Sequence, residues 1–273
     1  MKYIYNIDKL KNHNENTVFE EKIGKKAQNL LELAANGFNV PHFSVITNRY
    51  FKEIILKEIE MYNQEAGNND EIKDWNAVFS GNTERKIENI IRIIKNHKIK
   101  EEFEKEIENA LNEESYYAVR SSSIEEDSSN FSFAGQFETY LYVKKENIFE
   151  KIKEVWISSF SSHVMRYRKE GKINNEINVP AVIIQEMINS EKAGVGFSVN
   201  PVNGDHDEIV ISGTFGLGTS IVDGDENGDL FIYNKETKEI KKEIGIKKVK
   251  QSLDFENHGI KVEEINVEDE VLN

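Results

Sequence analysis

Hydrophobic positions in the first 115 residues recur mainly every three or four residues, the spacing of one helical face. Residues 24–36 place Ala27, Leu30, Leu31 and Ala34 on one such face, and Gly37 with Pro41 predicts the end of that helix. FSVIT then reads as a short strand, a helix beginning near residue 48 follows, and residues 82–113 predict two more amphipathic helices. The first part of the chain is therefore expected to be rich in helix.

After residue 115 the period of the pattern shortens toward two. Six segments are predicted as strands: YYAVR, FETYLYV, VPAVIIQEM, AGVGFSVN, DEIVISG and DLFIYN. NIFEKIKEVWISSF between them is predicted as a helix. The whole pattern predicts one α+β domain over residues 1–273 with two approximate lobes, helix-rich 1–115 and sheet-rich 116–273.

Charge and composition narrow the class of protein. The 273 residues carry a net charge of −14, which would repel a phosphate backbone, so nucleic acid is not an expected partner. No apolar run approaches the roughly 18–20 residues that cross a bilayer, and the first residues lack the apolar centre of a secretory signal. The chain is therefore expected to be cytoplasmic, and the lack of cysteine, which excludes thiolate metal sites, fits such a reducing compartment.

The segment 116–143 joins two predicted strands by a loop of serines, small residues and glycine after Arg120. A guanidinium at a strand end, with hydroxyls and small residues nearby, suits phosphate oxygens. The alternative is a surface turn in which Arg120 pairs with Glu125, Glu126 or Asp127. Residue types alone favour that alternative.

Two further stretches are weak candidates by themselves. In GKKAQNL, Gly24 at a helix start with Lys26 behind it could bind phosphate through the helix dipole and the ammonium, although no Walker A motif is present. Gly216-Leu217-Gly218 could equally be a flexible turn between strands.

Taken in order, these stretches resemble the N-terminal nucleotide-binding domain shared by pyruvate phosphate dikinase, phosphoenolpyruvate synthase and rifampin phosphotransferase, an ATP-grasp-like fold. The resemblance covers almost the whole chain. It rests on five stretches and a looser sixth: Gly24 to Leu30 with Val40-Pro41, Ala118 to Ser122 with Glu126-Asp127, Ser132 to Thr139, Ile184 to Pro201, Gly216 to Gly224, and Gly245 to Lys250.

The resemblance implies a set of ATP-binding positions. Lys26 and Arg120 would contact the phosphates, the loop carrying Gly135 would fold over them, and Thr139 would lie near them. The strand with Gln185 would pass the adenine, and Met187 and Ile188 would supply an apolar wall and backbone groups. Each of these side chains could instead be an ordinary surface, core or ion-pair residue.

Departures from the family pattern concern acidic residues. Thr219 and Ser212 stand where the family commonly has glutamate, and Gly24-Lys25-Lys26-Ala27 replaces Gly-Gly-Lys-Gly. The carboxylate that would bind Mg²⁺ is expected beyond Asn273, so no metal ligand is assigned here. None of the six histidines has the context of the family's phosphorylated histidine.

Two functions remain open from the sequence. In the first, the chain binds Mg-ATP and passes a phosphoryl group to a histidine on a separate swivelling domain, en route to pyruvate or a similar acceptor. As a fragment it would bind ATP weakly and not turn over alone. The alternative is a nucleotide-binding or regulatory module without phosphotransfer activity.

Overall fold

The computed structural model describes residues 3–7, 16–65, 72, 74–123, 137–170, 177, 179–222, 228–257 and 259–272. It divides into two compact units, Met1–Met187 and Ile188–Asn273, which are described separately. Helices and strands are both abundant, which confirms the α+β prediction. The predicted change at residue 116 marks the start of a strand within unit 1, whereas the division between units falls after Met187.

Unit 1 is built on one five-stranded sheet with the order β1-β2-β5-β3-β4. Every neighbouring pair is antiparallel. The strands are β1 (Ile4–Asn6), β2 (Phe43–Ile46), β3 (Tyr117–Ser122), β4 (Thr139–Val143) and β5 (Ala181–Glu186). Strands from both predicted lobes therefore form a single sheet, because β3 and β5 pair beside β2.

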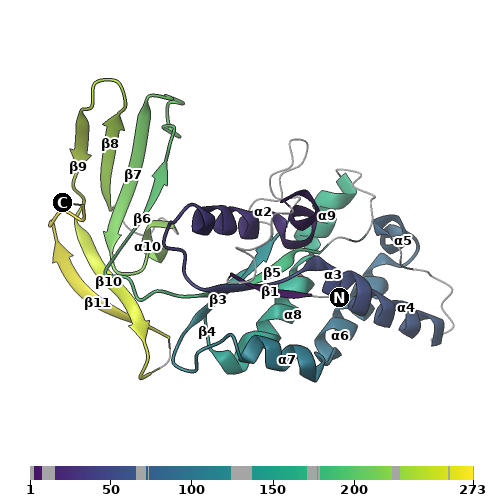
Figure 1. Ribbon diagram of the computed structural model, residues 1–273. Helices are drawn as coiled ribbons and strands as arrows, with labels where there is room; N and C mark the ends of the chain where they lie inside the picture. The colour runs from purple at the N-terminus through teal and green to yellow at the C-terminus, as the bar shows by residue number, and fades with distance from the viewer. Residues whose placement is uncertain are drawn as a thin grey trace. The chain divides into compact units, whose positions relative to one another are not determined.

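Helices cover both faces of this sheet, with α2 on one side and α6, α7 and α8 on the other (Figure 1). The predicted helices within 82–113 and 147–160 are confirmed as α6, α7 and α8. The helical segments of unit 1 are α2 (Asn16–Ala35), α3 (Asn48–Tyr50), a π-helical turn (Phe51–Ile55), α4 (Leu56–Glu65), α5 (Trp75–Phe79), α6 (Thr83–Asn96), α7 (Glu101–Glu108), a 3₁₀ turn (Lys145–Asn147), α8 (Ile148–Ser158) and α9 (Ser162–Glu170).

The larger core lies on the side of the sheet that carries α8. Ile148, Ile152 and Val155 recur at helical spacing and are fully buried, which explains why this segment forms a helix facing the sheet. Trp156 stacks on Tyr50 with ring centroids 5.5 Å apart. Burial raises the pKa of Tyr50 to about 12, with Glu58 and Glu104 acting in the same direction.

The smaller core lies on the other face, beneath α2. Ile23 and Ala27 of the helix pack with Phe43 and Val45 of β2 and with Ile183 of β5. The predicted apolar stripe of this helix is therefore confirmed as core, because Leu30, Leu31 and Ala34 also pack against the same cluster.

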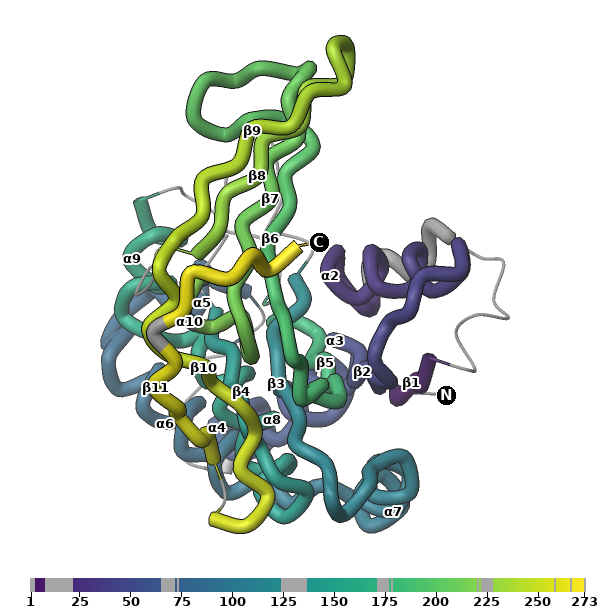
Figure 2. Tube along the Cα trace, turned by 90° about the vertical axis from the view of Figure 1, so that its left-hand side faces the viewer, coloured from purple at the N-terminus to yellow at the C-terminus, as the bar shows by residue number. Residues whose placement is uncertain are grey.

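The described residues of unit 2 form a four-stranded antiparallel sheet, a two-stranded antiparallel hairpin and a short helix (Figure 2). Its elements are β6 (Lys192–Phe197), β7 (Glu208–Phe215), α10 (Thr219–Val222), β8 (Asp229–Asn234) and β9 (Ile240–Glu243), followed by the hairpin strands β10 (Lys247–Asp254) and β11 (Gly259–Val267). Three of these strands, β6 to β8, are the ones that the alternating pattern predicted.

One buried ion pair joins distant parts of unit 2. Lys247 Nζ donates to Asp229 Oδ1 at 2.6 Å, and both side chains are fully buried. The backbone N–H of Gly245 donates to the same oxygen at 3.1 Å, and the N–H of Val271 donates to Oδ2 at 2.7 Å. The carboxylate thus has a donor on each oxygen, which a buried charge requires.

No helix among the described residues combines the length and the apolar character needed to span a membrane.

Candidate functional site

A bend in α2 places its second half against the end of β3. Gly24 has non-helical dihedral angles (φ 74°, ψ 167°) inside the helix. A Cβ built on Gly24 would lie 2.2 Å from the carbonyl oxygen of Ser122. Only glycine fits this close approach and this positive φ, which gives the glycine at this predicted helix start a physical reason.

Two hydrogen bonds hold the helix start after Gly24. The N–H of Lys25 donates to the carbonyl oxygen of Ser123 at 3.3 Å, and the N–H of Ala27 donates to Ser122 Oγ at 3.1 Å. The first N–H groups of a helix have no partner within the helix, so β3 supplies acceptors that the helix lacks. Lys26 lies between these two anchored residues and is half-buried.

Arg120 lies on the same face of β3 as Ser122, because side chains two residues apart in a strand share a face. Its Nη1 donates to Gln185 Oε1 on the neighbouring strand β5 at 3.0 Å. Thr139, on the neighbouring strand β4, pairs directly with Arg120 and is exposed. Its side chain therefore lies beside that of Arg120. Three of the predicted positions are therefore assembled on the α2 face of one sheet.

Met187 and Ile188 follow the end of β5. The N–H of Met187 donates to the carbonyl oxygen of Tyr116 at 2.8 Å, and the Met187 sulfur accepts from the N–H of Tyr142 at 3.1 Å. Met187 is thus fixed beside β3 and β4. Ile188 is the first residue of unit 2, and 56% of its surface is exposed.

Part of the predicted site lies outside the described residues. Gly135 belongs there, as do Glu125, Glu126 and Asp127, the acids that could pair with Arg120. The predictions for these four residues therefore stay predictions. Among the described residues there is no group of three or more His, Asp or Glu side chains that could hold a metal ion.

The sequence did not identify Ser122 as the residue that fixes the start of the helix, nor Gln185 as the partner of Arg120. Both contacts depend on tertiary structure: on the register of β3 with β5 and on the position of α2 against the sheet. The serine run after Arg120 was the only signal, and it could not say which hydroxyl turns toward the helix.

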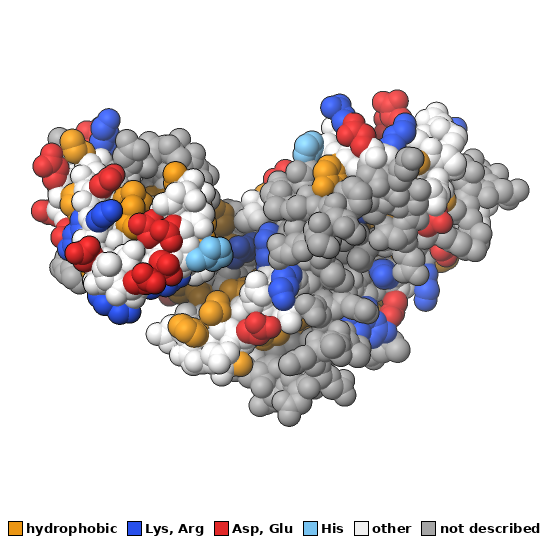
Figure 3. Space-filling view, turned by 90° about the horizontal axis from the view of Figure 1, so that it is seen from above, with side chains coloured by type: hydrophobic (Ala, Val, Ile, Leu, Met, Phe, Trp, Pro, Cys, Tyr) orange, Lys and Arg blue, Asp and Glu red, His pale blue; other side chains and the backbone are white. Residues whose placement is uncertain are grey.

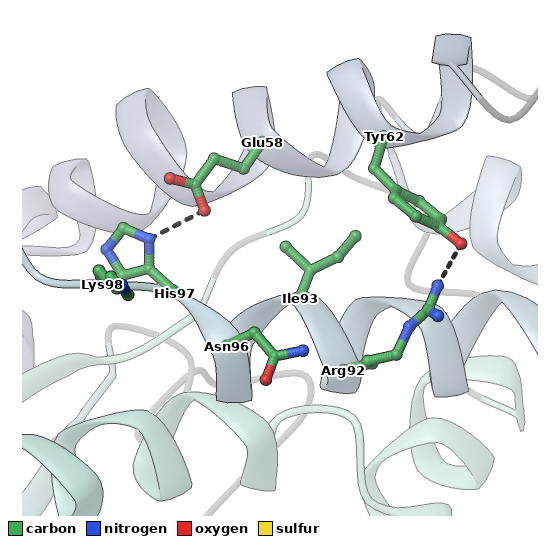
Figure 4. A pocket seen from close by; sticks show the side chains of 7 residues that line it. All are labelled: Glu58, Tyr62, Arg92, Ile93, Asn96, His97 and Lys98. Carbon is green, nitrogen blue, oxygen red and sulfur yellow. Dashed lines mark hydrogen bonds and ion pairs between the residues drawn. The ribbon is translucent and has the colours of Figure 1, made fainter.

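A cavity of about 450 Å³ lies between α4 and α6, away from the predicted positions. Two contacts bridge these helices along it: Glu58 Oε2 with His97 Nδ1 at 2.8 Å, and the Tyr62 hydroxyl with the Arg92 guanidinium (Figure 4). The other nitrogen of His97 lies 3.0 Å from the Tyr50 hydroxyl inside the larger core. These groups brace the helices, and none of the predicted site residues lines this cavity.

In unit 2, the Gly-Leu-Gly stretch is anchored to β10. Gly216 has φ +77°, and a Cβ there would lie 2.2 Å from the carbonyl oxygen of Gln251. The N–H of Leu217 donates to that oxygen at 2.8 Å, and the Thr219 hydroxyl donates to the Gln251 side chain. The first glycine is therefore required by a close backbone contact, and Thr219 takes part in the same attachment.

A second cavity, of about 480 Å³, lies within unit 2 and is lined by Ser212, Asp229 and Glu243 among others. Lys247, which belongs to the sixth stretch of the sequence resemblance, forms an ion pair with Asp229. Over the described part of the face drawn in Figure 3, acidic and basic side chains are interspersed. An anion would therefore need cations gathered at one place on the surface.

Comparison with known proteins gives one family and a consistent set of relatives. Residues 20–273 match the family model described as "Pyruvate phosphate dikinase, AMP/ATP-binding domain". The chain is 37% identical over 230 residues to the uncharacterized phosphotransferase YvkC of Bacillus subtilis, covering 83% of this chain and 25% of that protein.

Two archaeal relatives are named for phosphoenolpyruvate synthesis. The phosphoenolpyruvate synthase of Aeropyrum pernix is 40% identical over 166 residues, which is 59% of this chain and 20% of that protein. The probable phosphoenolpyruvate synthase of Methanocaldococcus jannaschii is 32% identical over 248 residues, 88% of this chain and 20% of that protein. The chain thus spans a fifth to a quarter of the length of these relatives. Because the family model covers nearly all of its residues, the chain belongs to the pyruvate phosphate dikinase AMP/ATP-binding domain family.

Proposed function

We propose that the chain binds ATP on the α2 face of the unit 1 sheet, with Lys26 and Arg120 contacting the phosphates and Thr139 beside them. The observation that carries this is the attachment of the helix start at Gly24–Ala27 to Ser122 and Ser123, next to the strand position of Arg120. Lys26 lies within this helix start and Arg120 lies two residues before Ser122, which supports a shared site for the two cations. The positive end of the helix dipole at this helix start favours an anion in the same place.

The remaining site positions extend this proposal. The backbone at the end of β5, from Gln185 to Met187, passes the adenine, Met187 and Ile188 add apolar side chains, and the loop with Gly135 closes over the phosphates. The domain has the two-lobed ATP-grasp-like organisation of its family. Magnesium accompanies ATP at this site.

The reaction proposed for the whole protein is transfer of a phosphoryl group from ATP to a histidine on a separate swivelling domain. Pyruvate or a similar acceptor then receives it. Relatives named as phosphoenolpyruvate synthases and as a phosphotransferase support this class of reaction. In such a transfer the protein mainly positions charges around the phosphates, which is the role given to Lys26 and Arg120.

The test is calorimetric titration of the chain with a nonhydrolysable ATP analogue and magnesium. We expect saturable, weak binding that Lys26→Ala reduces at least tenfold, because an ammonium contacting phosphate is lost. Lys57→Ala is the matched control, since Lys57 is an exposed lysine of α4. Absence of saturable binding, or equal loss in both variants, would reject the proposed site. Saturable binding without phosphoryl transfer, once a histidine domain is supplied, would instead favour a module without transferase activity.

A further inference from the structure

We propose that Gln185 is a positioning residue that fixes the Arg120 guanidinium for the phosphates without neutralising its charge. This inference rests on the proposed function, because it assigns a new role within the same site. Sequence resemblance placed Gln185 beside the adenine, whereas the contact seen here is with the proposed phosphate-binding side chain.

The register of the sheet makes this contact specific. Gln185 lies opposite Ala118, and Arg120 lies opposite Ile183, so Gln185 and Arg120 are diagonal neighbours on antiparallel strands. Diagonal neighbours are separated by roughly 7–8 Å between Cα atoms, a gap that only long side chains bridge. Arg120 Nη1 and Gln185 Oε1 close it at 3.0 Å.

The burial of Gln185 explains why its hydrogen bond restricts the conformation of the Arg120 side chain. Only 8% of Gln185 is exposed, and its strand neighbours on this face include the fully buried Phe43 and Ile183. A buried amide needs a hydrogen-bond partner, and a charged donor is the strongest kind. The two residues therefore restrict each other's rotamers, which lowers the entropy lost when a phosphate binds.

An amide is suited to this task because it is uncharged. A carboxylate at the same place would form an ion pair with the guanidinium and offset the positive charge that attracts phosphate. The Gln185 carbonyl accepts one N–H and leaves the net charge of the guanidinium unchanged. Gln at this position therefore orients the guanidinium without neutralising its charge.

Binding of two nucleotide fragments distinguishes this role from a direct adenine contact. Gln185→Leu should weaken tripolyphosphate binding about fivefold to tenfold and leave adenosine binding unchanged. Gln185→Glu should weaken tripolyphosphate further and reduce its dependence on salt, since the positive charge is then offset. Weaker adenosine binding with unchanged tripolyphosphate binding would overturn the inference.

A double-mutant cycle adds a second criterion. In an Arg120→Ala background, Gln185→Leu should cause no further loss of tripolyphosphate affinity, because the residue through which Gln185 acts is gone. Additive losses would overturn the inference. Ser44→Ala, a buried polar residue on the opposite face of the same sheet, is the control and should leave both affinities unchanged.

Nitrogen-15 NMR of the arginine side chains, recorded without nucleotide, separates this inference from the proposed function. Gln185→Leu should shift and average the Arg120 guanidinium signals, whereas Ser44→Ala should not. Unchanged Arg120 signals would overturn the inference whatever binds. If those signals change but the unmodified chain binds no tripolyphosphate, the proposed function fails, and with it the positioning role, leaving only a structural bond.

Discussion

The two faces of the unit 1 sheet differ in what their side chains contact. On one face, Val119 and Ile184 enter a large core of helices and aromatic rings. On the other, Arg120, Ser122 and Gln185 lie on the face that α2 packs against, and the apolar cluster beneath α2 is small. Alternate residues of strand β3 therefore pack in the large core on one face and form polar contacts on the other. One face stabilises the unit through its large core, and the other face can therefore carry polar groups.

The largest expected effect tests the stabilising face. Trp156→Ala should reduce the free energy of unfolding by about 3–5 kcal/mol, because a fully buried ring stacked on Tyr50 is lost and a cavity remains. Guanidinium chloride denaturation measures this. A loss below about 1 kcal/mol would mean that the core repacks freely and that the contrast between the faces is weaker than described.

Gly24→Ala tests how the other face is assembled. We expect a loss of about 3 kcal/mol in stability, since an added Cβ meets the Ser122 carbonyl at 2.2 Å and φ is positive. Gly37→Ala is the control, because Gly37 also has a positive φ (+83°) but no atom within 4 Å of the added carbon. It should lose only about 1 kcal/mol. Equal losses would show that the contact with β3 contributes nothing.

Alkaline pH should weaken the stabilising face selectively. Tyr50 has an ordinary pKa of 10.0, raised to about 12 by burial, so the unfolded chain releases this proton first. The stability is complete below pH 10 and falls as the pH rises toward 12, by about 2–3 kcal/mol for this group. Tyr140, whose pKa burial also raises to about 12, adds to the same slope.

Denaturation at a series of pH values in the native chain and in Tyr50→Phe measures this contribution. The variant should show a shallower decline above pH 10. An identical slope would indicate that Tyr50 ionises as easily in the folded protein as in the unfolded chain.

Neighbouring substitutions on β3 compare the faces most directly. Val119→Ala removes two buried carbons and should cost about 2 kcal/mol of stability with unchanged affinity for the ATP analogue. Arg120→Ala should weaken that affinity about tenfold, equivalent to about 1.4 kcal/mol, and should cost only about 1 kcal/mol of stability, because the buried Gln185 amide loses this partner. The reverse pattern would assign Arg120 to a structural ion pair, as residue types alone suggested.

Ser122→Ala is expected to have the smallest effect. Loss of the acceptor for the Ala27 N–H should cost about 1 kcal/mol of stability, in the range of a helix cap. Ser44→Ala is the control, because Ser44 is a buried serine on the opposite face of the sheet from α2. If both variants were equally stable, the Ser122 hydroxyl would not help to hold α2.

Sequence patterns predicted most elements of unit 1 and the first strands of unit 2, since helical and strand periods are local properties. They did not predict the short helix at Trp75, the helix beginning at Ser162 or the hairpin of β10 and β11. Most of β10 is half-buried and most of the described part of β11 is exposed, and charged residues interrupt both strands, so they lack a clear alternation of apolar positions.

The site was predicted through resemblance, and its internal contacts were not. The bond from Arg120 to Gln185 joins residues 65 positions apart, and the position of Ser122 beneath Ala27 joins residues 95 apart. Such contacts depend on strand register and helix seating, which no local pattern specifies. The apparent border at residue 116 had the same origin: a change of period marks a new element, and β3 lies inside the sheet that β1 and β2 begin.

The Asp229 carboxylate has a practical consequence for shortening the protein. Val271 is almost fully buried and its N–H satisfies one oxygen of that carboxylate. Deleting the last few residues would leave one oxygen of the buried carboxylate without its hydrogen-bond donor. The expected loss of stability is about 1–3 kcal/mol or more. A trimmed end that looks dispensable in the printed sequence would thus act on unit 2 as a core substitution does.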